Sequence, residues 1–418
     1  MLRLTTLLLL VPLAVQAQPI VSPTGPDAEA FGAAENYPIG TLQTLGVQKH
    51  MVGAYSHYDT LLPTRPVPRA AIPSIFARTP GELTLAYAWQ GAQHDLADYL
   101  ERHPATGLLI AHDRTILTEH YRYARTDQDR FTSQSMAKTV LSMLIGIAIG
   151  EGKIHSVDDL ASTYVPELAG SPIGDTPIRA LLHMASGVAF NEVYNGRDDV
   201  ARMSRELRRL PPDPPGTATP GAATAAILRQ FDQRTAPPDT VFGYAGLNSE
   251  TLGLVLRRAT ATPVADYLAT RIWQRIGAEA DASWVIDGSG QEQTHCCLNA
   301  TLRDWARFAL LLANDGRWDD AQLIPRQYLL DATTAAPPDS FLAPRRNNRF
   351  YGYGYQTWTL PGPRRQFALL GVHGQIILID PQSKLVLIHT AVRPQAARDP
   401  MAPELLALWA ALVAQEGK

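Results

Sequence analysis

The chain has 418 residues, of which 45% are hydrophobic and 18% charged, and its formal net charge is -3 at pH 7. A chain of this length can bury one large hydrophobic core or two ordinary ones, so the composition predicts a globular protein. A charge this small, without a long run of Lys or Arg, is not the electrostatic pattern of a protein that binds nucleic acid or an anionic membrane surface. We therefore expect a small-molecule substrate as partner, and no nucleic acid.

The first residues, MLRLTTLLLLVPLAVQAQP, have the order of a signal peptide. Arg3 gives a basic start, about a dozen apolar residues follow, and Val15 and Ala17 stand at the spacing of a cleavage site. The apolar stretch is too short for an ordinary membrane span, and no later run of about twenty apolar residues occurs. The sequence thus predicts a signal peptide at 1–17, cleavage after Ala17, and an exported protein that is periplasmic or secreted.

The next segment, 18–90, is rich in Pro, Gly and Ala with weak periodicity, and we expect an extended arm with little regular structure. Two β-rich runs flank Asp113 and Arg114 and predict a hairpin within 106–124. The run FTSQSMAKTVLSML at 131–144 then has apolar residues at helical spacing, and Gly150 and Gly152 predict the end of that helix.

Between about 155 and 315 the pattern is mostly helical, interrupted by a proline-rich loop at 210–221. Candidate helices lie at 176–185, 198–209, 222–233, 247–260, 263–276 and 301–314. The C-terminal part changes to three β-rich runs, at 351–360, 366–380 and 384–392, before an amphipathic helix at 402–415.

This order predicts an α/β (α+β) fold with an antiparallel sheet built from both chain ends, because short connections join antiparallel neighbours. We assign 91–154 and 316–418 to the sheet domain and 155–315 to an inserted, mostly helical region. The arrangement brings the helix that starts near Ser135 next to the C-terminal strands.

Ser135 and Lys138 stand three positions apart at the start of the apolar helix. Positions i and i+3 of a helix face the same side, so the two side chains can meet. A serine hydroxyl needs a base to become a nucleophile, and a lysine in its neutral form, which burial favours, can serve as one. The alternative is that both are ordinary polar residues on the first turn of a buried helix.

Five stretches in a fixed order strengthen the catalytic interpretation: 131–154, 164–194, 237–284, 298–318 and 371–381. With them the chain resembles the serine β-lactamase-like superfamily, class C-like branch, and within it the 6-aminohexanoate-dimer hydrolases. The resemblance spans about 103–395. It implies a β-lactamase/transpeptidase-like fold and an acyl-enzyme mechanism that requires no metal and no organic cofactor.

The resemblance also implies a role for Tyr244 in FGYAGLN, which matches the tyrosine that passes a proton to the leaving group. Here the chain departs from the family. Gly246 replaces the asparagine of the usual Tyr-x-Asn motif, and Asn248 comes two positions too late.

A second departure concerns the Lys-Thr-Gly or His-Thr-Gly element, whose place is taken by Leu369, Leu370 and Gly371. The cation and hydroxyl that bind a β-lactam carboxylate are therefore absent, which argues against penicillin-type substrates. By the same resemblance, the backbone N–H groups of Ser135 and Val372 form the oxyanion hole.

Four further residues are candidates for substrate binding. Tyr194 matches a tyrosine that contacts the substrate amide in aminohexanoate hydrolases, with packing of a loop aromatic as the alternative. Asn299 could reach the site or cap the following helix. His373 and Gln375 could line the site or lie on a solvated strand end.

The only two cysteines, Cys296 and Cys297, are adjacent. A ring closed between neighbouring residues is strained, and His295 alone does not complete a zinc site. The sequence thus argues against both a disulfide and a metal site. We expect the arginines at 205–209 to lie on a solvated helix end.

Together these features predict an exported serine hydrolase that cleaves an amide or ester bond of a small linear substrate through an acyl-enzyme on Ser135. The alternatives are a carboxylesterase, a β-lactamase or D-peptidase, and a catalytically silent binding protein of the same fold.

Overall fold

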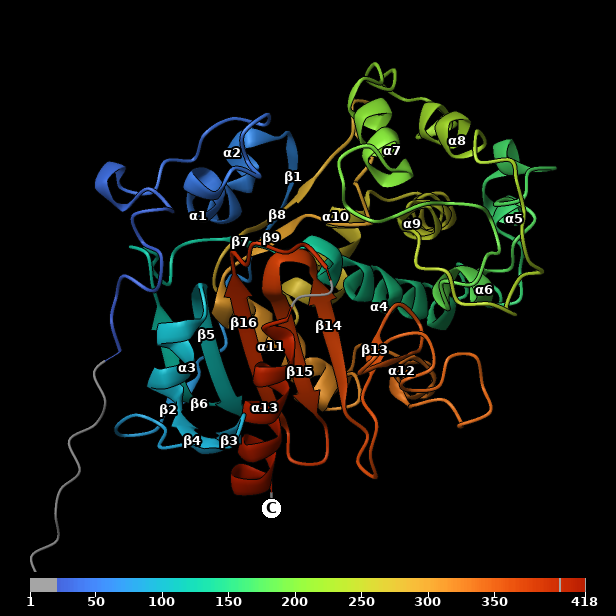
Figure 1. Cartoon of the computed structure of the whole chain (residues 1–418). Helices are drawn as coiled ribbons and strands as arrows, with labels where there is room; N and C mark the ends of the chain where they lie inside the picture. The colour runs from blue at the N-terminus through green and yellow to red at the C-terminus, as the bar shows by residue number, and fades with distance from the viewer. Residues whose placement is uncertain (1–20, 398–399, 418) are drawn as a thin grey trace, which may run out of the picture.

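The computed structural model describes residues 21–397 and 400–417, and the predicted signal peptide lies outside them. Within these residues a central eight-stranded sheet has helices on both faces, with a mostly helical region beside it (Figure 1). Its strands in spatial order are β12 (Gly352–Tyr353), β13 (Trp358–Thr359), β14 (Phe367–Gly371), β15 (Gln375–Asp380), β16 (Leu385–Ala391), β5 (Ala105–His112), β6 (Thr115–Tyr121) and β2 (Ala77–Arg78). All neighbours pair antiparallel except β2 and β6.

The pairing of β16 with β5 joins the C-terminal strands to the predicted hairpin, β5 and β6. This confirms a sheet built from both chain ends. Successive side chains of a strand point to opposite faces, and both faces of this sheet are covered. Leu109 and Ala111 pack in the cluster that contains α11 (Leu302–Ala313), whereas Leu108 and Ile110 pack with α13 (Ala402–Glu416).

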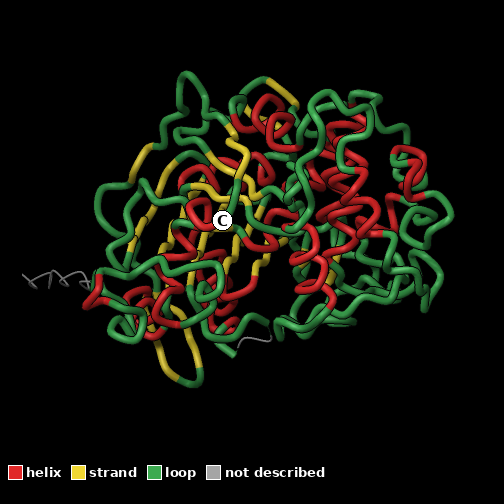
Figure 2. The backbone as a smooth tube through the Cα atoms, turned by 90° about the horizontal axis from the view of Figure 1, so that it is seen from above, coloured by secondary structure: helices red, strands yellow, loops and turns green. Residues whose placement is uncertain are grey.

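The predicted helices are present, and several of them are shorter than expected. Many helices lie together on one side of the molecule, and others lie among the strands (Figure 2). The helix after Ser135 is α4 (Ala137–Gly150), which ends at the predicted glycine. The inserted region contains α5 (Ala161–Tyr164), α6 (Ile178–Leu182), α7 (Asp199–Arg208), α8 (Ala222–Leu228), α9 (Gly246–Thr260), α10 (Val264–Leu268) and α11. After α11 come a short hairpin of β10 (Arg317–Trp318) and β11 (Ala321–Gln322) and then helix α12 (Arg326–Thr333).

Two expectations were wrong. The run 366–380 is not one strand but β14 and β15, joined by the turn η5 (Val372–Gly374), because His373 and Gly374 have left-handed φ values of 61° and 91°. The segment 18–90 is also not without regular structure. It contains α1 (Gln48–Ser56), α2 (Tyr58–Leu61), β1 (Thr64–Val67), β2 and β3 (Ala86–Trp89), the last paired with β4 (Ala92–Asp95).

A second, four-stranded sheet explains why the arm is ordered. Among the described residues its order is β1, β8 (Ala282–Val285), β9 (Leu298–Ala300) and β7 (Phe131–Thr132). Strand β1 pairs with β8, and β7 lies immediately before the segment that carries Ser135. The arm is thus tied by backbone hydrogen bonds to the strands beside the candidate nucleophile (Figure 1).

Helix α13 is anchored at its start by the buried carboxylate of Glu404. This group accepts hydrogen bonds from Arg102 at 2.5 Å, from His103 Nε2 at 2.8 Å and from the Tyr87 hydroxyl at 2.7 Å. Arg102 ends α3 (Leu96–Arg102), so the anchor joins both ends of the sheet domain. Burial, with the charge of Arg393, lowers the pKa of His103 from 6.5 to about 4.

None of the helices formed by the described residues is long and apolar enough to span a bilayer.

His103 should make the folded protein less stable in mild acid. The unfolded chain protonates this side chain near pH 6.5 and the folded chain only near pH 4. The unfolded state therefore binds more protons in this window, and the free energy of unfolding should fall by up to about 3 kcal/mol as the pH is lowered from 7 to 4. Urea unfolding at several pH values should show a flatter pH dependence for His103→Gln than for wild type. Equal pH dependences would contradict this assignment.

Candidate active site

Ser135 lies in the tight turn η2 (Gln134–Met136) that leads into α4. Gln134, just before it, has a left-handed φ of 46°, which is unfavourable for a residue with a side chain and needs support from its surroundings. That support comes from the segment before β9. The Cys297 N–H donates to the Gln134 carbonyl oxygen at 3.3 Å, and the Leu298 N–H donates to Ser133 Oγ at 3.0 Å. Ser135 itself is half exposed and so accessible to a substrate.

The Lys138 amine lies in the first turn of α4, facing Ser135 as the spacing predicts. Its Nζ donates to Ser135 Oγ at 2.9 Å and to the carbonyl oxygen of His295 at 2.6 Å. The lysine is only 1% exposed. These two hydrogen bonds hold the amine at the hydroxyl, within the distance that general-base catalysis requires.

Tyr244 completes the group, from the loop just before α9. The Lys138 Nζ lies 5.0 Å from the centre of the Tyr244 ring, which stacks on Trp358 at a centroid distance of 5.7 Å. Burial raises the pKa of Tyr244, and the Lys138 charge and hydrogen bonding with Ser135 and Lys138 offset this only in part. The phenol is therefore protonated at neutral pH and can donate a proton.

The turn between β14 and β15 brings a second backbone N–H to the nucleophile. Gly371 ends β14 against the Ser135 turn, where a Cβ would lie 2.4 Å from the Ser133 carbonyl oxygen. Only glycine permits this approach. The next residue, Val372, begins the turn η5, so its backbone N–H comes from the segment beside the turn that carries the Ser135 N–H. Both N–H groups can thus bind an oxyanion.

Tyr194 belongs to the loop beside Tyr244. Its hydroxyl donates to Glu192 Oε1 at 2.8 Å, and Glu192 Oε2 accepts from the Gly246 N–H at 2.5 Å. Burial, with the negative charge of Glu192, raises the pKa of Tyr194 well above its usual value. A Cβ on Gly246 would lie 3.2 Å from Glu192 Oε2, so this carboxylate lies beside the position where the family has asparagine.

Two of the predicted substrate-binding residues, Asn299 and Gln375, are buried and make structural contacts instead. Asn299 is fully buried in β9 and donates to the carbonyl oxygen of Ser283 in β8 at 3.2 Å, and Thr301 rather than Asn299 caps α11. Neither role expected for Asn299 therefore holds. Gln375 is 1% exposed and donates to the Ala391 carbonyl oxygen at 2.7 Å, which ties β15 to β16 and contradicts a solvated strand end.

His373 lies next to Val372 in the turn η5 rather than on a strand. Its Nδ1 is hydrogen-bonded to the Arg393 carbonyl oxygen at 2.7 Å. Its ring packs against that of Tyr55 from α1 in a T-shaped arrangement, with the ring centroids 5.6 Å apart. Asn248, the late asparagine of the motif, is buried with its amide 3.6 Å from Met184 Sδ. It does not replace the missing motif residue.

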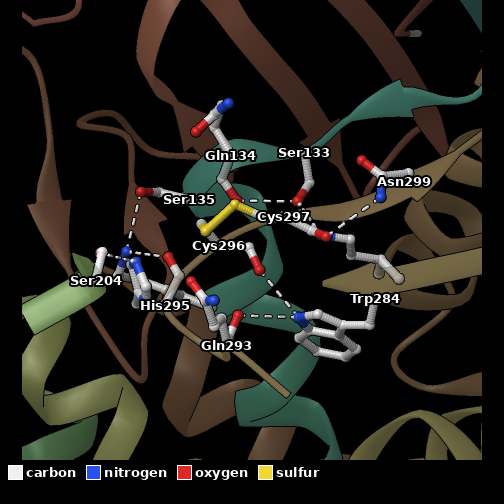
Figure 3. Close-up of a disulfide and its surroundings, with 12 residues drawn as sticks. Ser133, Gln134, Ser135, Ser204, Trp284, Gln293, His295, Cys296, Cys297 and Asn299 are labelled. Atoms are coloured by element: carbon white, nitrogen blue, oxygen red, sulfur yellow. Dashed lines mark hydrogen bonds between the residues drawn. A yellow bond between two sulfur atoms is a disulfide. The ribbon is translucent and has the colours of Figure 1, made fainter. Parts of the chain in front are cut away.

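Sequence reasoning missed the segment that carries His295. Its carbonyl oxygen accepts a hydrogen bond from Lys138, and its side chain is hydrogen-bonded with Glu250. The expectation of no disulfide was also wrong, because Cys296 and Cys297 are bonded to each other at this place (Figure 3). The adjacent cysteines were the one sequence signal for a disulfide here, and the sequence analysis set it aside because a ring between neighbouring residues is strained.

The arginines at 205–209 are not all solvated. Arg205 and Arg209 are exposed, whereas Arg208 is half-buried, and burial lowers its pKa. Burial raises the pKa of Tyr58 in α2, and Gln134 and the positive charge of Arg208 offset this in part. The arm and α7 thus both approach the Ser135 turn. In the described part of the chain no three His, Cys, Asp or Glu side chains form a group that could hold a metal ion.

Comparison with known proteins agrees with this geometry. The Beta-lactamase family matches residues 93–410. The chain belongs to the beta-lactamase family. A 6-aminohexanoate-dimer hydrolase of Paenarthrobacter ureafaciens is 25% identical over 370 residues, which cover 87% of this chain and 90% of that protein.

Solved structures extend the likeness to the fold. A Bacillus anthracis structure provisionally described as a 6-aminohexanoate-dimer hydrolase superposes with a TM-score of 0.77 at 23% identity, over 89% of this chain and 96% of that one. EstCE1, a hydrolase with promiscuous acyltransferase activity, has a TM-score of 0.56 at 13% identity, over 74% of this chain and 93% of that one. These findings confirm the β-lactamase/transpeptidase-like fold.

Replacing Lys138 by Ala should lower the rate at which Ser135 is acylated by about three orders of magnitude, because the hydroxyl loses its base. Stopped-flow or quenched reaction with an active ester measures this rate. Lys153→Ala, at an exposed lysine just beyond α4, is the matched control and should react like wild type. Near-normal acylation of Lys138→Ala would remove Lys138 from the mechanism.

Proposed function

We propose that the protein is an exported serine hydrolase that cleaves an amide or ester bond of a small linear substrate through an acyl-enzyme on Ser135. The observation that carries this proposal is the 2.9 Å hydrogen bond between Lys138 Nζ and Ser135 Oγ, with the Tyr244 ring centre 5.0 Å from the same Nζ. Membership of the beta-lactamase family supports the same chemistry.

Acylation begins when Ser135 Oγ attacks the substrate carbonyl carbon and its proton passes to Lys138 Nζ. The N–H groups of Ser135 and Val372 bind the resulting oxyanion, each contributing roughly 3 kcal/mol in comparable sites. Tyr244 donates its proton to the leaving amine or alkoxide as the bond to the carbonyl carbon breaks, and Lys138 returns a proton to the phenolate. Water then attacks the acyl-enzyme by the same path, which releases the acid and restores Ser135.

The substrate proposal follows from the two departures from the family pattern. Strand β14 ends in Leu369, Leu370 and Gly371, without the cation and hydroxyl that would bind a β-lactam carboxylate. Gly246 stands where the family motif usually has an asparagine, and its N–H donates a hydrogen bond to the Glu192 carboxylate. The name of the Paenarthrobacter relative, a hydrolase of a linear amide dimer, supports a small linear amide or ester.

Export is proposed from the N-terminal sequence, with its basic start, apolar run and small residues before Gln18. The Cys296–Cys297 disulfide supports it, since disulfides form and persist mainly in oxidising compartments outside the cytosol.

A fluorophosphonate probe tests the nucleophile. We expect covalent labelling of wild type and none of Ser135→Ala, measured by mass spectrometry of the intact protein. Ser204→Ala is the control, because Ser204 is a second partly exposed serine near the site, 3.4 Å from His295 Nε2, and this variant should still be labelled. If wild type resists the probe, the silent binding protein becomes the better explanation.

Tyr244→Phe should affect amides more than activated esters. An amine leaves only after protonation, whereas p-nitrophenolate leaves without it, so turnover of 6-aminohexanoate dimer should fall by about 10²- to 10⁴-fold and that of a p-nitrophenyl ester by much less. Tyr164→Phe in α5, at the outer side of the helical region, is the matched control (Figure 1). Equal losses on both substrates would remove Tyr244 from the leaving-group step, and rapid hydrolysis of nitrocefin by wild type would contradict the argument against β-lactams.

A further inference from the structure

The Cys296–Cys297 disulfide lies on the segment that connects the base to the turn of the nucleophile (Figure 3). On one side of the disulfide, the carbonyl oxygen of His295 accepts a 2.6 Å hydrogen bond from Lys138 Nζ. On the other side, the Cys297 N–H donates to the Gln134 carbonyl oxygen at 3.3 Å. Residues 295–297 thus contact both Lys138 and Gln134, the residue immediately before Ser135.

The same segment is anchored to the core on its outer side. The Cys296 carbonyl oxygen accepts from Trp284 Nε1 at 2.9 Å, and the Cys296 N–H donates to the Gln293 carbonyl oxygen at 3.2 Å. The His295 N–H donates to Glu250 Oε1 at 3.1 Å. Because both flanks are held, the backbone between Cys296 and Cys297 determines where the His295 carbonyl and the Cys297 N–H point.

That piece of backbone adopts an unusual conformation. Cys297 has a φ of 72°, in the left-handed region that residues with a side chain rarely occupy. A covalent bond between the two side chains closes a small ring that restricts the dihedral angles between the residues. Without the ring, Cys297 is free to return to the common regions of φ and ψ, and the carbonyl and N–H groups on either side would then turn away from their partners.

We propose that the Cys296–Cys297 disulfide is a positioning element of the active site: it holds the His295 carbonyl against Lys138 and the Cys297 N–H against Gln134, and its reduction slows acylation of Ser135. The inference rests on the proposed function. It makes the activity of the enzyme depend on the thiol–disulfide state of its surroundings.

Reduction requires a dithiol from outside the protein. One thiolate of the reagent attacks the sulfur of Cys296, which is partly exposed, while Cys297, 3% exposed, leaves as a thiolate and takes up a proton. The second thiol of the reagent then attacks the mixed disulfide and releases the Cys296 thiol. The dithiol is oxidised to its cyclic disulfide, and two electrons and two protons pass to the cysteines.

The test compares oxidised and dithiothreitol-reduced mature wild-type protein. The chain has no other cysteine, so the reagent has no second disulfide to act on. Fluorophosphonate labelling gives a maximal inactivation rate and a half-saturating probe concentration. We expect reduction to lower the rate by about tenfold or more, as small misplacements of catalytic groups do, without changing the half-saturating concentration, and re-oxidation to restore it.

The matched control is the double variant Cys296→Ala, Cys297→Ala, which should label slowly whether or not dithiothreitol is present. Equal labelling rates of oxidised and reduced wild type would overturn this inference and leave the hydrolase proposal standing. Loss of far-ultraviolet circular dichroism on reduction would overturn it as well, since the bond would then stabilise the whole fold. Failure of the oxidised protein to label would instead reject the proposed function.

Discussion

The hydrogen bond from Lys138 Nζ to Ser135 Oγ is the interaction on which the rest of the site depends, because a serine hydroxyl has little nucleophilic strength without a base. The fold supports it from three directions. The turn η2 leads directly into α4 and so brings the two side chains together, the His295 carbonyl oxygen accepts a hydrogen bond from the amine, and the left-handed Gln134 lies immediately before Ser135. A lysine that is 1% exposed can keep this geometry only inside a well-packed core.

Segments from across the whole chain meet at this bond. The turn after β14 provides the Val372 N–H, and the loop before α9 provides Tyr244. Strand β9 supports the Ser135 turn through β7, and the N-terminal arm joins the same small sheet through β1. The arm is therefore part of the scaffold of the site, which explains why its residues are ordered despite their weak periodicity. Both sheets and the helical region therefore contribute segments to the surroundings of the Lys138–Ser135 hydrogen bond.

The departures from the family pattern also form a consistent set. Where the family commonly has an asparagine, this chain has Gly246 with the Glu192 carboxylate bonded to its N–H, and Tyr194 is bonded to the same carboxylate. Where the family has a cation and a hydroxyl, β14 has two leucines, of which Leu369 is fully buried. The Ser135–Lys138 pair and Tyr244 match the family pattern, whereas residues at the neighbouring motif positions differ from it. Such a division is expected when one fold serves different substrates.

The sequence by itself determined what depends on near neighbours along the chain: the β5–β6 hairpin, α4 with its end at Gly150, and the pairing of Ser135 with Lys138. Each follows from a periodicity of a few residues, which the backbone geometry of helices and strands imposes directly. The family resemblance added Tyr244. Only the tertiary structure decided which carbonyl holds Lys138, that Asn299 lies inside the small sheet, and that Cys296 and Cys297 bond to each other, because these depend on contacts across more than a hundred residues or on a backbone conformation that such contacts enforce.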